Sequence, residues 1–180
     1  GYDLKPMREL LTIDAQITFA VLPLLSHSRE AASAIHQAHR EVLMHLPMEP
    51  QSYPKEKPGA GALFTDMSHD EVVMQLEKNL DSIPHAKGVN NHMGSKFMSD
   101  EEKLTTVFRQ LKKRDLFFID SRTTADSKTA AASEKVHLTV ASRRIFLDHE
   151  RDYAKIYRIL KDAAEAPAGA EAGEGCPCRR

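Results

Sequence analysis

The stretch GVNNHMGS, residues 88–95, decides how this sequence is read. It opens with small and apolar residues and then offers two amides, an imidazole and a Gly-Ser turn. An apolar run that gives way at once to polar side chains is typical of a buried strand ending at the rim of a sheet. The stretch therefore predicts a strand whose carboxyl end carries Asn91, His92 and Ser95.

Two other segments have the same form. The run EVLMHLPME, residues 41–49, is apolar and then offers His45 and Glu49, and the run LFFIDSRT, residues 116–123, offers Asp120 and Arg122. Ligands of open parallel sheets and barrels bind at the carboxyl ends of the strands. Three strands that finish in such residues predict one shared site.

Helical patterns separate these strands. Ser68 and Glu71 form a capping box that predicts a helix through Leu80, and Ser99 with Glu102 repeats the pattern ahead of three cations at residues 112–114. Residues 28–39, 125–135 and 151–164 also read as helices, and residues 17–22, 138–140 and 145–147 as strands. Alternating strands and helices predict an α/β fold with parallel strands.

Composition excludes several classes of protein. The chain has 180 residues, 41% of them hydrophobic, and a net charge of −1, which fits one globular domain without a basic field for nucleic acid. No apolar run approaches the roughly 20 residues that span a bilayer, and no secretory leader opens the chain. The only cysteines, Cys176 and Cys178, lie near the end of the chain and indicate no redox compartment.

The histidines suggest a metal site. Imidazoles on neighbouring strands suit zinc or a similar divalent ion, and a catalytic zinc takes about three protein ligands and one water. His45 and His92 with the carboxylate of Asp120 would meet this need, and Glu49 is a weaker carboxylate candidate. Either histidine alone is better explained as a hydrogen-bonded structural residue, but two at equivalent positions favour a site.

The remaining polar residues carry two interpretations each. Asn91 could orient a sugar or carbonyl oxygen, or simply form a turn. Ser95 could help to bind an oxyanion or turn the chain, and Arg122 could anchor a substrate or pair with Asp120. The long connection at residues 47–66 is either a substrate lip or a tolerated surface insertion.

Five motifs together resemble the divergent polysaccharide deacetylase family. They are TFAVLP at 18–23, HLPMEP at 45–50, GVNNHMGS at 88–95, FFIDSRT at 117–123 and FLD at 146–148. The resemblance runs over residues 1–164, which we expect to form the domain, and we expect the Ala/Gly/Glu-rich tail at 165–180 to be disordered.

The resemblance implies a distorted (β/α) barrel of parallel strands and a bacterial periplasmic or other extracytoplasmic setting. The family pattern also opens with a strand ending in Asp-Asp and closes with one ending in Gly-His-Pro. Neither motif is found in this sequence. The barrel would then be incomplete, with exposed strand edges that favour an oligomer.

The resemblance further implies a metal-dependent hydrolase that removes acetyl groups from an N-acetylated glycan. In this hypothesis His45 and His92 hold a divalent metal, zinc for preference, and His92 and Asp120 are catalytic, with Asp120 accepting the proton of the attacking water. Substrate-binding roles fall to the following residues: Glu49, Asn91, Ser95 and Arg122. The alternative is a glycan-binding or cell-envelope scaffold protein without turnover.

Overall fold

The structure is a computed structural model that describes residues 3–147 and 150–165. Its contacts divide the chain into two units, one up to Ser142 and one from Arg143 onward. Among the described residues, no helix has the length and apolar character needed to cross a membrane.

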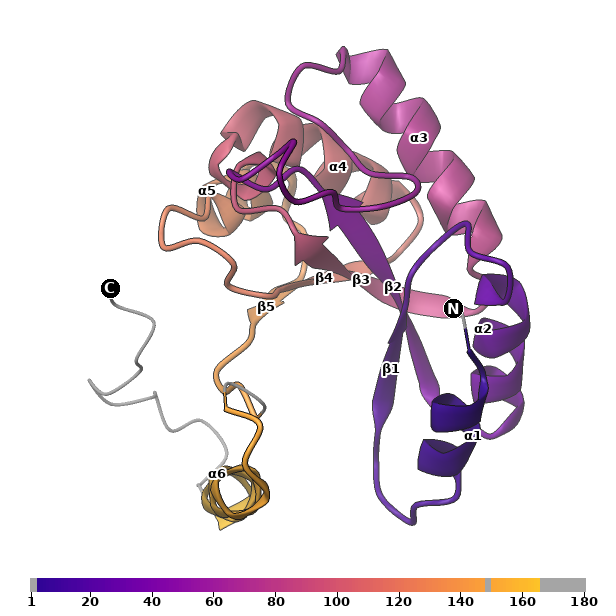
Figure 1. Cartoon of the computed structure of the whole chain (residues 1–180). Helices are drawn as coiled ribbons and strands as arrows, with labels where there is room; N and C mark the ends of the chain where they lie inside the picture. The colour runs from indigo at the N-terminus through magenta and orange to yellow at the C-terminus, as the bar shows by residue number, and fades with distance from the viewer. Residues whose placement is uncertain (1–2, 148–149, 166–180) are drawn as a thin grey trace. The chain divides into compact units, whose positions relative to one another are not determined.

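The first unit contains a parallel sheet of five strands in sequence order (Figure 1). The strands are β1 (Thr18–Val21), β2 (Glu41–Met48), β3 (Ala86–Met93), β4 (Phe117–Asp120) and β5 (Val140–Ser142). The predicted α/β class with parallel strands is confirmed. Over the described residues the sheet is open, with β1 and β5 at its edges.

Helices connect successive strands. The first unit contains α1 (Lys5–Leu11), α2 (Ser28–Gln37), α3 (His69–Ser82), the 3-10 turn η1 (Phe97–Ser99), α4 (Glu101–Lys113) and α5 (Thr129–Val136), and the second contains α6 (Tyr153–Glu165). The capping box predicted at Ser68 and Glu71 is present and starts α3. It satisfies two backbone N–H groups that the first turn of a helix leaves without partners.

The capping box predicted at Ser99 and Glu102 is wrong. Asp100 is the N-cap of α4, and its carboxylate accepts a hydrogen bond from the backbone N–H of Lys103 at 3.0 Å. Ser99 instead ends η1, which buries Phe97 and Met98. Burial of these two side chains shapes the turn and shifts the start of the helix by one residue.

Three other boundaries differ from the predictions. The strand expected at 138–140 begins only at Val140, the helix expected at 125–135 begins only at Thr129, and residues 145–147 form no strand. In the second unit, the guanidinium of Arg143 lies 3.2 Å from the centre of the Phe146 ring. This contact joins two side chains and does not require residues 145–147 to pair with a strand. Of the expected tail, residues from 166 onward lie outside the described residues.

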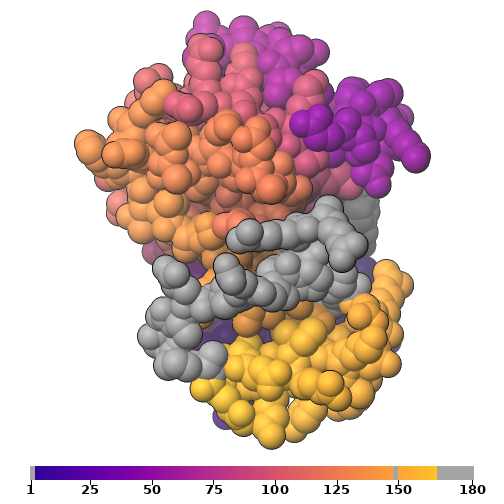
Figure 2. All heavy atoms as spheres, turned by 90° about the vertical axis from the view of Figure 1, so that its left-hand side faces the viewer, coloured from indigo at the N-terminus to yellow at the C-terminus, as the bar shows by residue number. Residues whose placement is uncertain are grey.

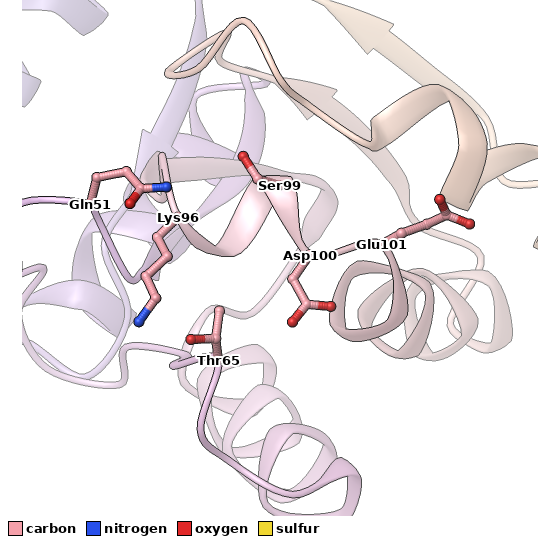
Figure 3. A pocket seen from close by; sticks show the side chains of 6 residues that line it. All are labelled: Gln51, Thr65, Lys96, Ser99, Asp100 and Glu101. Atoms are coloured by element: carbon pink, nitrogen blue, oxygen red, sulfur yellow. The ribbon is translucent and has the colours of Figure 1, made fainter.

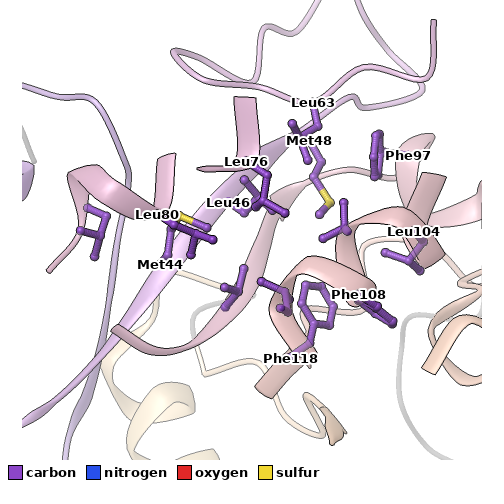
Figure 4. Packing of buried hydrophobic residues seen from close by; sticks show 14 of the residues in the cluster. Met44, Leu46, Met48, Leu63, Leu76, Leu80, Phe97, Leu104, Phe108 and Phe118 are labelled. Carbon is purple, nitrogen blue, oxygen red and sulfur yellow. The ribbon is translucent and has the colours of Figure 1, made fainter. Parts of the chain in front are cut away.

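The two faces of the sheet differ in character. Met44, Leu46 and Met48 alternate along β2 and are fully buried in the hydrophobic core. This core also contains side chains of α3 and α4, among them Leu76, Leu80, Leu104 and Phe108 (Figure 4). His45 lies between Met44 and Leu46 in the strand and therefore points to the opposite face. The helix-covered face is dry, and the other carries half-buried polar groups.

The loop between β2 and α3, residues 49–68, is fastened to the fold. The backbone of Leu63 donates to Pro47 O at 3.0 Å, and that of Glu49 donates to Leu63 O at 2.9 Å. The fully buried Asn79 of α3 donates to Gly61 O at 2.7 Å. Gly61 has a φ of +75°, and a Cβ there would lie 2.3 Å from Asn79 Oδ1. These contacts favour a built-in loop over a loose insertion.

Candidate functional site

Two histidines meet on the open face of the sheet. His45 Nε2 and His92 Nδ1 are 3.1 Å apart, with the ring planes at 63° to each other. The register explains the meeting, because His45 pairs with Asn90 and Pro47 with His92. Both rings are half-buried. They lie within β2 and β3 rather than beyond the strand ends, because both strands run further than the sequence indicates.

Asn90 holds one of these rings. Its Oδ1 is 3.0 Å from His45 Nδ1, and its amide nitrogen donates to Ser121 Oγ at 3.4 Å. An amide oxygen only accepts, so we assign the proton of His45 to Nδ1. The lone pair of His45 Nε2 then points toward His92. Oriented imidazoles of this kind are what metal sites use.

The surroundings of His92 favour its neutral form. Burial lowers the pKa of its imidazole below the ordinary value of 6.5. A neutral ring offers a nitrogen lone pair, whereas a protonated ring donates at both nitrogens. The neutral ring of His92 can therefore offer a nitrogen lone pair to a cation.

Asp120 does not join the histidine pair. Ile119 pairs with Asn90 and shares the histidine face, so Asp120 takes the opposite face with Phe118. Its carboxylate, 2% exposed, accepts from Ser127 Oγ at 2.6 Å, from Thr129 Oγ1 at 2.8 Å and from a backbone N–H. The expectation that Asp120 would complete a triad with the histidines is not met. No group of three His, Cys, Asp or Glu side chains suited to a metal exists among the residues described.

Asn91 also points away from the pair. It is 1% exposed, and its amide nitrogen donates to Met93 O at 2.8 Å and to Thr123 Oγ1 at 3.1 Å. Its Oδ1 accepts from the backbone N–H of Ser121, whose hydroxyl donates to Asn91 O, both at 2.8 Å. In the structure Asn91 thus connects the end of β3 to the segment after β4.

Glu49 forms a cluster at the end of β2. Its Oε1 accepts from Lys96 Nζ at 2.8 Å, and its Oε2 accepts from the backbone and hydroxyl of Thr65 at 2.8 and 2.7 Å. Burial raises the pKa of the Glu49 carboxyl, but these hydrogen bonds outweigh burial and lower the pKa overall. The cluster joins the β2–α3 loop to the turn after β3.

Ser95 and Arg122 lie nearer to solvent. Ser95 Oγ accepts from the backbone N–H of Gln51 at 2.9 Å. Arg122 is exposed, has a φ of 56°, and meets Asp120 through its backbone N–H at 2.7 Å. Of the two interpretations of Arg122, ion pairing with Asp120 receives no support from these contacts. Arg122 is placed two residues beyond the end of β4, at the edge of the sheet where the strands end.

The structure adds partners that sequence reasoning missed. Ser127 and Thr129 hold Asp120, and Lys96 and Thr65 hold Glu49. Lys96 and Glu49 are 47 residues apart, and no local motif marks such a pair. The role of Asn90 could have been found from the strand register, which places it beside His45.

Comparison with known proteins decides the family. A sequence model described as divergent polysaccharide deacetylase matches residues 1–170. The chain belongs to the divergent polysaccharide deacetylase family. The resemblance seen in the five motifs is thereby confirmed.

Related sequences occur in two bacteria. The chain is 36% identical over 157 residues to the uncharacterized protein YibQ of Escherichia coli, covering 87% of this chain and 48% of YibQ. It is 30% identical over 163 residues to an uncharacterized protein of Haemophilus influenzae, covering 91% of this chain and 58% of the relative. The chain therefore spans about half the length of these curated relatives.

A solved structure supports the fold. The crystal structure of the uncharacterized protein ATU2773 from Agrobacterium tumefaciens superposes with a TM-score of 0.84 at 23% identity. The match covers 90% of this chain and 66% of that protein. At this identity the likeness shows the fold alone.

Proposed function

We propose that this chain carries the histidine half of a metal site in a hydrolase that deacetylates N-acetylated glycans. The observation that carries the proposal is the 3.1 Å separation of His45 Nε2 and His92 Nδ1. Two nitrogens bound to one tetrahedral zinc at about 2.0–2.1 Å lie about 3.3 Å apart. A metal could therefore replace the proton between the two rings after a shift of a few tenths of an ångström.

The donor set fits a divalent metal in type. Both ligands are imidazoles, and Asn90 fixes the ring of His45 as an outer partner would. The described residues supply two of the three protein ligands that a catalytic zinc takes. In this proposal the third ligand and the general base belong to parts of the protein outside the described residues. Asp120 serves the fold by holding the connection from β4 to α5.

Each residue of the site has a defined task. A bound metal would polarise the acetamide carbonyl and lower the pKa of a water molecule. His45 and His92 would hold it, Asn90 would orient His45, and the exposed Arg122 would contact the glycan. A bacterial extracytoplasmic setting, where envelope glycans are found, is part of the same proposal.

Elemental analysis tests the metal assignment. Wild type, His45→Ala, His92→Ala and the control His36→Ala are equilibrated with zinc, passed through a desalting column and analysed. His36 is exposed and stacks on His85 away from the pair. We expect zinc in wild type and in His36→Ala and little in the other two. Equal zinc in all four, or none in any, would refute the assignment.

A second candidate function is glycan binding without turnover. The burial of Asp120 on the opposite face favours it, because no carboxylate of the described residues joins the pair to accept a proton. Acetate release from N-acetylglucosamine oligomers separates the two functions. Saturable binding with no acetate released, with zinc added, would select the second function.

A further inference from the structure

A separate pocket lies beside the Glu49 cluster. Its volume is about 480 Å³, within the range of roughly 300–1,000 Å³ typical of ligand pockets. Figure 3 shows the side chains that line it, which come from the β2–α3 loop, the turn after β3 and the start of α4: Gln51, Thr65, Lys96, Ser99, Asp100 and Glu101. Three segments distant in sequence thus border one shallow, open depression.

The pocket walls are held in place. Glu49 binds both Thr65 and Lys96, and the backbone of Gln51 donates to Ser95 Oγ. Asp100 caps α4 through Lys103 N. A pocket whose walls are fixed before binding loses little conformational entropy when a ligand enters. A ligand can therefore bind here without a large rearrangement of the surrounding segments.

The lining chemistry selects the ligand. The Gln51 amide offers both a donor and an acceptor, and the Thr65 and Ser99 hydroxyls, which already donate to Glu49 and to Ser95 O, can still accept. The carboxylates of Asp100 and Glu101 outnumber the one ammonium, that of Lys96, which Glu49 already pairs, and so they disfavour a phosphate or another anion. All six lining side chains carry a polar group beside their apolar stems, which favours a ligand with both kinds of surface over a pure hydrocarbon. A ligand with several neighbouring hydroxyl groups, each of which can donate and accept a hydrogen bond, matches this lining.

An exposed aromatic residue belongs to the same loop as the pocket residues Gln51 and Thr65. Tyr53, two residues after Gln51, is 43% exposed, and its ring packs edge-on against Phe64 with centroids 5.0 Å apart. Phe64 directly precedes the pocket residue Thr65. Figure 2 shows the purple atoms of this loop at the surface of the first unit. A fixed and exposed aromatic ring offers a flat apolar surface at low entropic cost.

The pocket is distinct from the histidine pair. His92 is level with Pro47 in the register, and Glu49 lies two residues further along, which is about 7 Å of extended chain. The pocket lies beyond Glu49, so the two places suit neighbouring units of a glycan chain better than one sugar ring. We propose that the pocket and Tyr53 form a second sugar-binding subsite, which holds one unit of a glycan chain at a distance from the histidines. Its choice of ligand rests on the proposed function.

Calorimetric titration with an N-acetylglucosamine hexamer tests the subsite. The variants of the 180-residue chain are Gln51→Ala and Tyr53→Ala. The control is Lys57→Ala, which changes an exposed residue of the same loop outside the pocket. Loss of about 1 kcal/mol of contact raises the Kd about fivefold. We expect that increase in the first two variants and none in the control, with thermal unfolding unchanged.

Two results would overturn the subsite. One is a hexamer Kd in Gln51→Ala and Tyr53→Ala equal to that of wild type, and the other is no binding to wild type at millimolar hexamer. Adding Tyr53→Ala to His92→Ala separates this proposal from the previous one. We expect the double variant to bind the hexamer more weakly than His92→Ala alone, whatever the zinc content of either protein.

Discussion

Replacement of Asp120 distinguishes a structural carboxylate from a catalytic one. The side chain is 2% exposed and accepts three hydrogen bonds, from two hydroxyls and one backbone N–H. Asp120→Ala removes all three and leaves the Ser127 and Thr129 hydroxyls, 3.0 Å apart, with only each other as partners in this cluster. Hydrogen bonds to charged groups contribute about 1.5–3 kcal/mol each, and neighbouring losses add incompletely. We expect unfolding free energy to fall by about 3–5 kcal/mol.

Asp120→Asn should be milder. Its amide oxygen can still accept from the backbone N–H of Arg122, and the Ser127 and Thr129 hydroxyls can turn to accept from its amide nitrogen. We expect a loss of about 1–2 kcal/mol, since the charge that strengthens these bonds is gone. The control is Asp126→Asn on the same loop, whose pair with Lys128 is exposed and contributes about 0–1 kcal/mol.

Urea unfolding followed by circular dichroism measures these differences. The zinc content of each folded variant is determined in parallel. The structure predicts that Asp120→Asn loses stability but keeps its zinc. The reasoning would be refuted by an Asp120→Asn protein as stable as wild type that no longer holds metal. Asp120 would then act on the metal and not on the fold.

Three further predictions follow from single contacts. Burial lowers the pKa of His92 below 6.5, so the unfolded chain binds this proton more tightly and stability falls as the pH drops through and below about 6.5. Urea unfolding at pH 7.5 and 5.5 should show this loss in wild type and less of it in His92→Gln, and an equal loss in both would contradict the assignment. Gly61→Ala places a Cβ against Asn79 at positive φ and should lower the unfolding free energy by about 2 kcal/mol or more. A urea unfolding curve that overlays that of wild type would contradict this prediction. Asn90→Ala frees the ring of His45 and should weaken zinc binding about 10–100-fold in a chelator competition, and an unchanged affinity would exclude the orienting role.

The sequence predicts the strands but not the face on which each side chain lies. Apolar runs ahead of His45, His92 and Asp120 correctly indicate three neighbouring parallel strands. Position near a strand end does not reveal that Ile119, and not Asp120, shares a face with Asn90. Because side chains alternate along a strand, a difference of one residue in register moves a carboxylate to the opposite face.

Tertiary packing also determines features that local sequence motifs do not predict. The Ser99 pattern has the composition of a capping box, but burial of Phe97 and Met98 forms η1 and passes the cap to Asp100. The Glu49–Lys96 pair joins segments that meet only after the sheet has formed, so no periodicity announces it. The pocket beside it depends on that pair.

Zinc titration of the folded chain tests the central claim most directly. The proteins compared are wild type, His45→Ala, His92→Ala, Asp120→Asn and the control His36→Ala. We predict one zinc per chain in wild type, the same in Asp120→Asn and His36→Ala, and a loss of affinity of at least about tenfold in the other two. Full zinc affinity in His92→Ala, or loss of it in a folded Asp120→Asn, would contradict a metal site built on His45 and His92.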